Sequence, residues 1–219
     1  EGAHVAICAR HEDEVRKAAG ELDARPRGRA VGLVADLTRT EDRHGVVERT
    51  LQEMGSIQIL VNNAGTVGEG GTLEETPLEA WREIFELNLF AVVDLVSQVL
   101  PHMRREGWGR IVNISSENGR QPYPDMIHYS ASKGALDNFT KALSKHCAAD
   151  GMLVNTVSPA FIRTPLVEAM MERAAEAQGF SVEETMERFR KSRRPHIEVG
   201  RAGRIDEVGP LVAFLASEQ

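Results

Sequence analysis

The feature that most limits the fold is a regular alternation between short runs rich in valine and isoleucine and longer stretches with helical periodicity. The short runs are nearly continuous in apolar character, as is typical of strands that are covered on both faces. Each has the usual length of a strand, about six residues. The alternation predicts βαβ units, and therefore an α/β fold with a parallel sheet. The runs lie at residues 4–9, 30–35, 57–62, 110–115 and 152–157.

Helices are expected between and after these runs. Thr76-Pro77 is typical of an N-cap followed by proline at the first helical position. Apolar residues cover more than one face of the helix that follows, so it packs either against the sheet and a second subunit or at the centre of one thick core. Without repeats or a linker, residues 1–219 are expected to form a single domain. The predicted helices span 13–22, 40–54, 77–105, 128–149, 166–177, 183–191 and 206–216.

Composition excludes several classes of protein. The 42% of hydrophobic residues are enough for a substantial core, and the formal net charge of −7 disfavours nucleic acid and anionic membranes as partners. Cys8 and Cys147 lie far apart, which indicates a reducing compartment. The histidines are scattered without metal-ligand spacing, so no metal is expected. The sequence shows neither a membrane span nor a signal peptide, which favours the cytoplasm.

Two short motifs supply groups suited to proton transfer. Ser115 and Ser116 end a predicted strand, where ligand sites open in parallel α/β sheets. Tyr129 and Lys133 are four residues apart at the start of the next predicted helix and so share one face of it. A nearby ammonium lowers the pKa of a tyrosine, and a serine hydroxyl can bind the same substrate oxygen. These are the parts needed to interconvert an alcohol and a carbonyl.

Further motifs occur in a fixed order along the chain. They are Asn62-Asn63-Ala64-Gly65, Asn88, Ile111-Val112-Asn113-Ile114-Ser115-Ser116, Tyr129-Ser130-Ala131-Ser132-Lys133 and Val154-Asn155-Thr156-Val157-Ser158-Pro159. With these motifs the chain resembles the classical short-chain dehydrogenase/reductase family over its whole length. The resemblance implies a Rossmann-type doubly wound parallel β-sheet with helices on both faces, in three αβα layers. It also implies an NAD(P)(H)-dependent oxidoreductase that acts on CH–OH groups.

The resemblance implies a role for each catalytic position. Tyr129 would be the general acid in reduction and the general base in oxidation. Ser116, which has the family's spacing to this tyrosine, would orient the substrate oxygen. Lys133 would lower the pKa of the tyrosine and bind the nicotinamide ribose, and Asn88 would hold a water in the proton relay. Hydride would pass between the substrate carbon and the nicotinamide.

Cofactor preference is expected to depend on Arg10. After the first predicted strand, a carboxylate would favour NAD, whereas an arginine can pair with the 2′-phosphate of NADP. We therefore expect NADP(H) rather than NAD(H), the alternative being that Arg10 is only a solvated loop residue. Asn62 has a second interpretation as a tie between strands. The resemblance implies that further cofactor contacts come from Asp36, Leu37, Asn62, Ala64, Gly65, Tyr129, Lys133, Pro159, Ile162 and Thr164.

The chain also departs from the family pattern. The family's phosphate-binding turn, T-G-x-x-x-G-x-G, does not occur in the sequence, and Ala160 replaces the glycine that usually follows Pro159. The first residues match the entry to the family's second strand, and the last residues match the region before its final strand. We therefore expect the chain to be an internal part of a longer protein, lacking the first and last strands. The glycine-rich stretch 65–71 lacks a Walker lysine and favours a flexible rim of the active site.

Two other functions remain as alternatives to an oxidoreductase. A non-catalytic dinucleotide-binding regulator or scaffold would not need Ser116, Tyr129 and Lys133 together, and a serine hydrolase would need G-x-S-x-G, which is absent around Ser116. Residues 160–200 are expected to form a lid over a small carbonyl or alcohol substrate. The resemblance makes a 3-oxoacyl thioester the first guess for that substrate. It also implies a homotetramer or homodimer through the helices over 77–105 and 128–149.

Overall fold

The strands of the structure, a computed structural model that describes residues 2–25 and 28–218, pair in parallel. β1 (Val5–Ala9) pairs with β2 (Ala30–Val34). β4 (Gly109–Ile114) lies between β3 (Ile59–Asn62) and β5 (Met152–Val157). All five strands are present within two residues of the predicted bounds, and the predicted α/β class with parallel strands is confirmed.

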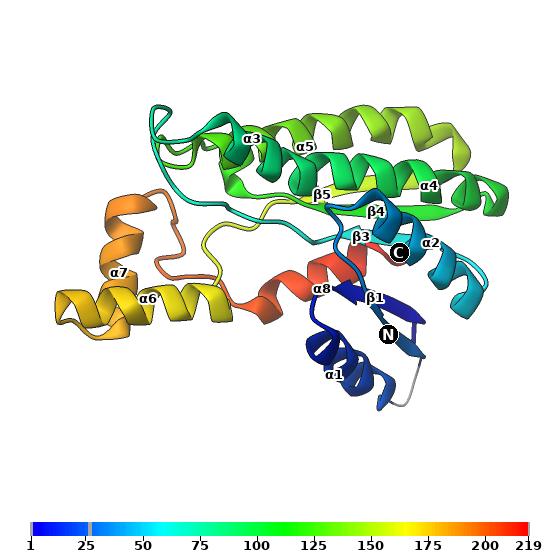
Figure 1. Cartoon of the computed structure of the whole chain (residues 1–219), viewed down its shortest axis with the longest axis horizontal. Helices are drawn as coiled ribbons and strands as arrows, with labels where there is room; N and C mark the ends of the chain where they lie inside the picture. Colours follow the sequence, from blue (N-terminus) through cyan, green and yellow to red (C-terminus); the bar gives the residue numbers. More distant parts are fainter. Residues whose placement is uncertain (1, 26–27, 219) are drawn as a thin grey trace.

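The strands form two sheets rather than one. Among the described residues β1 and β2 are not hydrogen-bonded to β3, and Figure 1 shows them set apart from the β3–β5 sheet, together with α1 (Glu12–Asp23). Apolar residues of β1 and β3 remain exposed: Val5 of β1 is 37% exposed, and Val61 of β3 is 39% exposed. The resemblance places the family's first strand between these two sheets. That a further strand lies there stays a prediction.

Helices cover the β3–β5 sheet on both faces, as predicted. α3 (Leu78–Phe85), a π-helical turn (Glu86–Phe90) and α4 (Ala91–Glu106) follow one another without a break. Together with α5 (Ile127–Cys147) they lie over one face, whereas α8 (Ile205–Leu215) lies under the other (Figure 1). α2 (Thr40–Met54) packs beside α4. The long helix begins at Leu78, with Pro77 as its N-cap, one residue later than predicted.

The continuous helix Leu78–Glu106 is long enough, at 29 residues, and apolar enough, at a mean hydropathy of 1.5, to cross a membrane. The inner face of this helix nevertheless packs in the core of the protein. Val96 and Val99 are buried in the same cluster as Ile111 of β4 and Leu136 of α5. A helix whose apolar face packs on a sheet is a core helix of an α/β layer, and its hydropathy reflects that burial.

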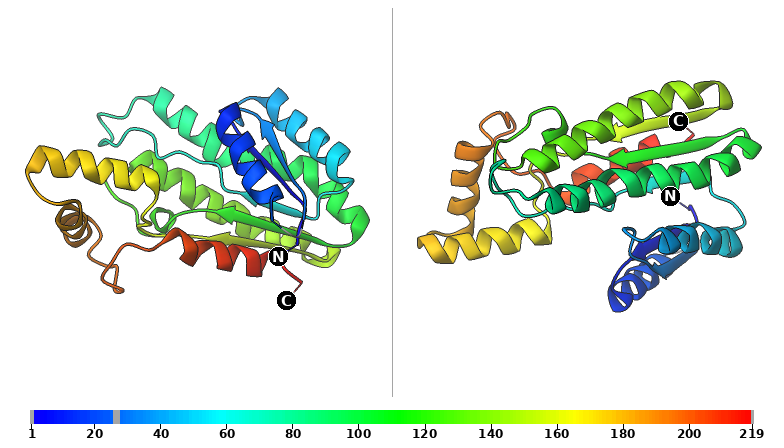
Figure 2. Two further views of the ribbon diagram at one scale, coloured as in Figure 1. Left: turned by 90° about the horizontal axis from the view of Figure 1, so that it is seen from below. Right: turned by 45° about the horizontal axis from the view of Figure 1, so that its top comes forward.

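The segment after β5 forms two helices that project away from both sheets (Figures 1 and 2). α6 (Pro165–Gln178) has Thr164 as its N-cap, and the Thr164 hydroxyl accepts a hydrogen bond from the Val167 amide at 3.3 Å. α7 (Val182–Arg193) begins with a capping box between Ser181 and Glu184. The two helices pack on each other. The sequence predicts a lid in this region. We refer to α6 and α7 together as the lid.

Candidate active site

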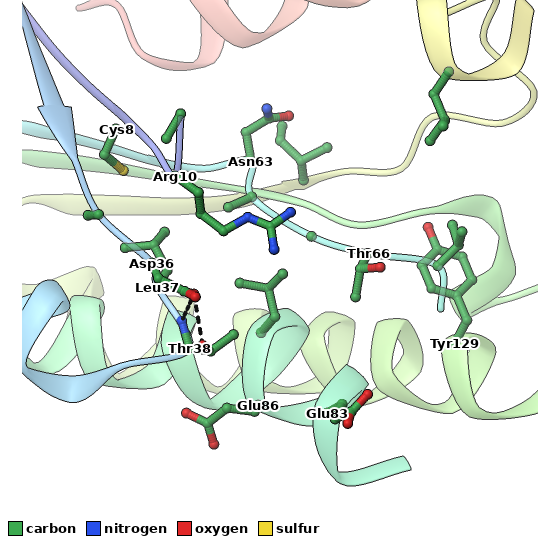
Figure 3. A pocket seen from close by; sticks show the side chains of 18 of the residues that line it. Cys8, Arg10, Asp36, Leu37, Thr38, Asn63, Thr66, Glu83, Glu86 and Tyr129 are labelled. Atoms are coloured by element: carbon green, nitrogen blue, oxygen red, sulfur yellow. Dashed lines mark hydrogen bonds between the residues drawn. The ribbon is translucent and has the colours of Figure 1, made fainter. Parts of the chain in front are cut away.

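A cavity of about 1160 Å³ opens at the carboxyl ends of the strands. At one end it is lined by residues that follow β1 and β2, including Arg10 and Asp36, and at the other by Tyr129 of α5 (Figure 3). Lys133 of α5 also lines it. Residues from both sheets therefore share one site. The position agrees with the rule that ligands of open α/β sheets bind beyond the carboxyl ends of the strands.

Arg10 provides a cation at the first end of this cavity. Its guanidinium points into the cavity (Figure 3), and no described residue forms an ion pair or hydrogen bond with it. The nearby Asp36 instead accepts hydrogen bonds from the amide and hydroxyl of Thr38, at 3.0 and 2.8 Å. These bonds, and to a smaller extent the charge of Arg10, hold the pKa of Asp36 below its usual range. Arg10 is thus available to an anionic ligand.

Ser116 and Tyr129 come together at the other end of the site. Ser116, just after β4, is 7% exposed and close enough to the Tyr129 phenol to lower its pKa through a hydrogen bond, whereas Ser115 and not Ser116 lines the cavity. This bond lowers the pKa of Tyr129, but burial has the larger effect and raises it. The Asn118 amide donates to the Ser116 hydroxyl at 3.3 Å, which fixes the serine side chain. No described histidine hydrogen-bonds Ser116, so the base that a serine hydrolase needs is not beside it.

Lys133 is buried behind the tyrosine. Its Nζ donates to the Ile114 carbonyl at 2.9 Å and lies 5.9 Å from the centre of the Tyr129 ring. Burial lowers the pKa of Lys133 to about 8, against an opposing effect of Asp137. The sequence interpretation expects this ammonium to lower the pKa of Tyr129. In the structure, burial is the largest effect on the pKa of Tyr129 and raises it. That Lys133 lowers this pKa stays a prediction.

Asn88 links the loop after β3 to α5. It is completely buried in the π-helical turn, a type of distortion that is frequent at functional sites. Its Nδ2 donates to the Thr66 carbonyl at 2.9 Å and to the Ser132 hydroxyl at 3.1 Å, and its Oδ1 accepts from the Thr66 amide at 2.9 Å. Ser132 in turn donates to the Tyr129 carbonyl at 2.8 Å. Asn88 therefore positions both the loop and α5.

Asn62 ties two strands together. Its Nδ2 donates to Asn113 Oδ1 at 2.8 Å, and the Asn113 amide donates to the Thr140 hydroxyl at 2.9 Å. This arrangement agrees with the second interpretation of Asn62 in the sequence. Asn63, which follows it, lines the cavity instead.

Three further positions predicted to contact the cofactor do not line the described cavity. Pro159 accepts a hydrogen bond from the Glu117 amide, Ile162 bridges to Gly203, and Thr164 caps α6. Their cofactor contacts stay predictions. The structure adds lining residues that the sequence motifs do not indicate, among them Thr38, Glu83 and Glu86. Asn63, Thr66 and Val67, which belong to the Asn62–Gly65 motif and to the glycine-rich stretch 65–71, also line the cavity.

Gly65 lies where a side chain would crowd the catalytic groups. A Cβ at this position would stand 3.2 Å from Asn88 Oδ1 and 3.5 Å from Lys133 Nζ. We expect Gly65→Ala to lower the free energy of unfolding by about 1–3 kcal/mol and to weaken dinucleotide binding, because these buried groups must move. Urea denaturation and a fluorescence titration with NADPH measure both effects.

Gly45→Ala is the matched control, because a Cβ on Gly45 in α2 meets nothing within 4 Å. Helix propensity should make this variant more stable by about 0.5–1 kcal/mol. Equal responses of the two variants would show that Gly65 is not under steric constraint.

Comparison with known proteins decides the family. The short chain dehydrogenase family matches residues 1–175. The chain belongs to this family. A protein of Streptomyces coelicolor named as a ketoacyl reductase is 36% identical over 218 residues, which cover 98% of this chain and 81% of that protein. The L-fucose dehydrogenase of Oryctolagus cuniculus is also 36% identical, over 99% of this chain and 71% of that enzyme.

Solved structures of this family share the fold. The L-sorbose reductase of Gluconobacter frateurii, complexed with NADPH and L-sorbose, superposes with a TM-score of 0.93 at 30% identity, covering 99% of this chain and 81% of that one. An NAD⁺-bound xylitol dehydrogenase superposes with a TM-score of 0.86 at 26% identity, covering 99% and 83%. The Rossmann-like αβα fold is thereby confirmed. This short-chain dehydrogenase is an oxidoreductase that interconverts an alcohol and a ketone with a nicotinamide cofactor.

Proposed function

We propose that Tyr129 is the proton donor and acceptor of this oxidoreductase, with Ser116, Lys133 and Asn88 as its partners. The observation that supports this most is that Tyr129 and Lys133 line one end of the cavity, with Ser116 close enough to Tyr129 to affect its pKa. A substrate oxygen placed between the two hydroxyl groups accepts a hydrogen bond from each. In reduction the phenol gives its proton to that oxygen, and in oxidation the phenolate takes the proton back.

The other residues of the site hold these groups in place. Lys133 supplies a buried ammonium behind Tyr129, with its pKa near 8. Asn88 joins Thr66 to Ser132 and so fixes the helix on which Tyr129 and Lys133 stand. The catalytic hydroxyl groups thus sit on rigid elements, as proton transfer in a defined geometry requires.

We also propose NADP(H) as the preferred cofactor. The described residues fit such a ligand at both ends: Arg10 and Asp36 lie where the adenosine would be held, and Gly65 leaves room beside Lys133 for the nicotinamide ribose. When bound, the nicotinamide supplies or accepts the hydride. The unpaired cation of Arg10 supports NADP(H) over NAD(H), because it can pair with the 2′-phosphate.

For the substrate we propose a 3-oxoacyl thioester, with a ketose as the second candidate. The likeness to a ketoacyl reductase supports the first, and the likeness to L-sorbose reductase supports the second. We expect NADPH oxidation, followed at 340 nm, to be fastest with an acetoacetyl thioester in a panel that also contains L-sorbose and small cyclic ketones. A higher kcat/KM for the ketose would assign the second candidate.

Assembly and location complete the proposal. We propose a cytoplasmic homotetramer or homodimer that pairs through the helices over 77–105 and 128–149, with residues 160–200 as the substrate lid of a single domain. Phe90, at the start of α4, is 52% exposed, which supports a partner on this face. Light scattering of the purified protein measures the assembly, and a monomeric mass would contradict the pairing.

A further inference from the structure

A cluster of charged and aromatic side chains joins the lid to the loop that follows Ser116. Glu117 forms an ion pair with Arg194, with 3.0 Å between Arg194 Nε and Glu117 Oε1, and accepts a hydrogen bond from the Tyr123 hydroxyl at 3.2 Å. His196 Nε2 lies 2.9 Å from Glu117 Oε2 and 3.0 Å from the Tyr123 hydroxyl. Arg194 and His196 directly follow α7, whereas Glu117 and Tyr123 belong to the connection between β4 and α5. Two residues that directly follow the lid therefore contact two residues of the connection between β4 and α5, which we call the catalytic loop.

The central ion pair of this cluster is shielded from water. The side chains of Arg194 and Glu117 are only 10% and 13% exposed. The Arg194 guanidinium lies 3.6 Å from the centre of the Tyr123 ring, which covers it. Next to it, Arg193 forms an ion pair with Asp125 of the same loop. A shielded pair with several hydrogen bonds resists the screening that makes exposed pairs weak, so these contacts can hold the lid in place.

The same pair lies close enough to Tyr129 to affect its ionisation. Burial is the largest cause of the raised pKa of Tyr129; the Glu117 carboxylate raises that pKa further, and the Arg194 guanidinium lowers it. The other cation beside the ring is Lys133, with Nζ 5.9 Å from the ring centre. The effects of Glu117 and Arg194 on the pKa of Tyr129 therefore oppose each other, and the loss of Arg194 leaves that of Glu117.

We propose that Arg194 is a positioning residue that fastens the lid to the catalytic loop through Glu117 and thereby sets a cation beside the proton-transferring tyrosine. The proposal rests on the role of Tyr129 proposed above. Leu166 of α6 lines the cavity, so fastening the lid also fixes one wall of the active site. When the lid detaches, Glu117 loses the cation of Arg194. The negative charge of Glu117 then disfavours the Tyr129 phenolate. Proton transfer is thus favoured in the closed site.

A spectroscopic titration tests the electrostatic part without turnover. The chain has two tyrosines, and burial raises the pKa of Tyr123 to about 12. The difference in phenolate absorbance between each variant and the same variant carrying Tyr129→Phe therefore reports the ionisation of Tyr129. We expect Arg194→Met to shift this ionisation to higher pH, because a stabilising cation is lost. Glu117→Gln should shift it to lower pH, and the double variant should lie between them.

Hydrogen exchange tests the mechanical part. We expect Arg194→Met and Glu117→Gln to speed amide exchange in α6 and α7 but not in β4. Substrate KM should rise roughly tenfold, the loss of one charged hydrogen bond. Arg188→Met is the matched control: Arg188 lies 3.8 Å from the Phe180 ring centre, within the lid, and its loss removes the same charge. This variant should keep the Tyr129 titration of the parent protein.

Two results would overturn the proposal. One is a Tyr129 titration that is the same in Arg194→Met as in the parent protein, and the other is lid exchange no faster in Arg194→Met than in Arg188→Met. Both measurements are independent of activity. An error in the proposed role of Tyr129 would appear separately, as full turnover by Tyr129→Phe.

Discussion

Tyr129→Phe is expected to lower kcat by about 10²- to 10⁴-fold, the contribution of a positioned general acid or base. The phenyl ring keeps the shape of the side chain, whereas the hydroxyl proton that the proposed mechanism transfers is lost. NADPH should still bind, because Arg10, at the opposite end of the cavity, is untouched. Stopped-flow turnover and a fluorescence binding titration measure these two quantities.

Tyr123→Phe is the matched control for this experiment. It removes the other phenol hydroxyl of the chain, which donates to Glu117 and not to Ser116. We expect its kcat to fall by less than about tenfold, the cost of one hydrogen bond to a charged group. A kcat of Tyr129→Phe equal to that of the parent protein would refute the proposed chemistry. If the parent protein binds NADPH but reduces no carbonyl, the regulator or scaffold alternative is favoured.

Arg10→Asp is expected to raise the Kd for NADPH by roughly 10- to 150-fold, because a charge-assisted hydrogen bond to phosphate is replaced by repulsion. The Kd for NADH should change by less than about threefold, since NADH has no 2′-phosphate and an aspartate can accept hydrogen bonds from its ribose. Binding titrations with the two dinucleotides give the ratio directly.

Arg39→Asp controls for the change in net charge. Arg39 lies close enough to Asp36 to affect its pKa, but it does not line the cavity. The ratio of the two Kd values should therefore stay that of the parent protein. If Arg10→Asp weakens both dinucleotides equally, Arg10 supports the fold of the loop and does not select the cofactor.

Much of the fold could be predicted from periodicity. The bounds of α2 and β5 agree with the expected residues 40–54 and 152–157, because Gly55 ends the helix and Asp150-Gly151 precedes the strand. The division of the long helix by a π-helical turn could not be predicted. That turn depends on the contacts of Asn88 with Thr66 and Ser132, which are distant in sequence. Local propensity contains no information about such partners.

The candidate site shows the same division. Tyr129 and Lys133 share a helix, so their proximity follows from a spacing of four residues, and the motif also contains Ser132. The sequence could not decide between two roles for Asn62. Its pairing with Asn113 depends on the register between β3 and β4, which only the assembled sheet defines.

The sequence by itself determined the family, the parallel α/β architecture and the identity of the residues suited to proton transfer, because these follow from periodicity and from motifs within single segments. Only the tertiary structure decided that Arg10 faces the same cavity as Tyr129, and that Arg194 reaches Glu117 across 77 positions of sequence. Charges act through space. Burial and the contacts between distant segments therefore set the pKa of Tyr129, and neither is encoded in any one stretch of the chain.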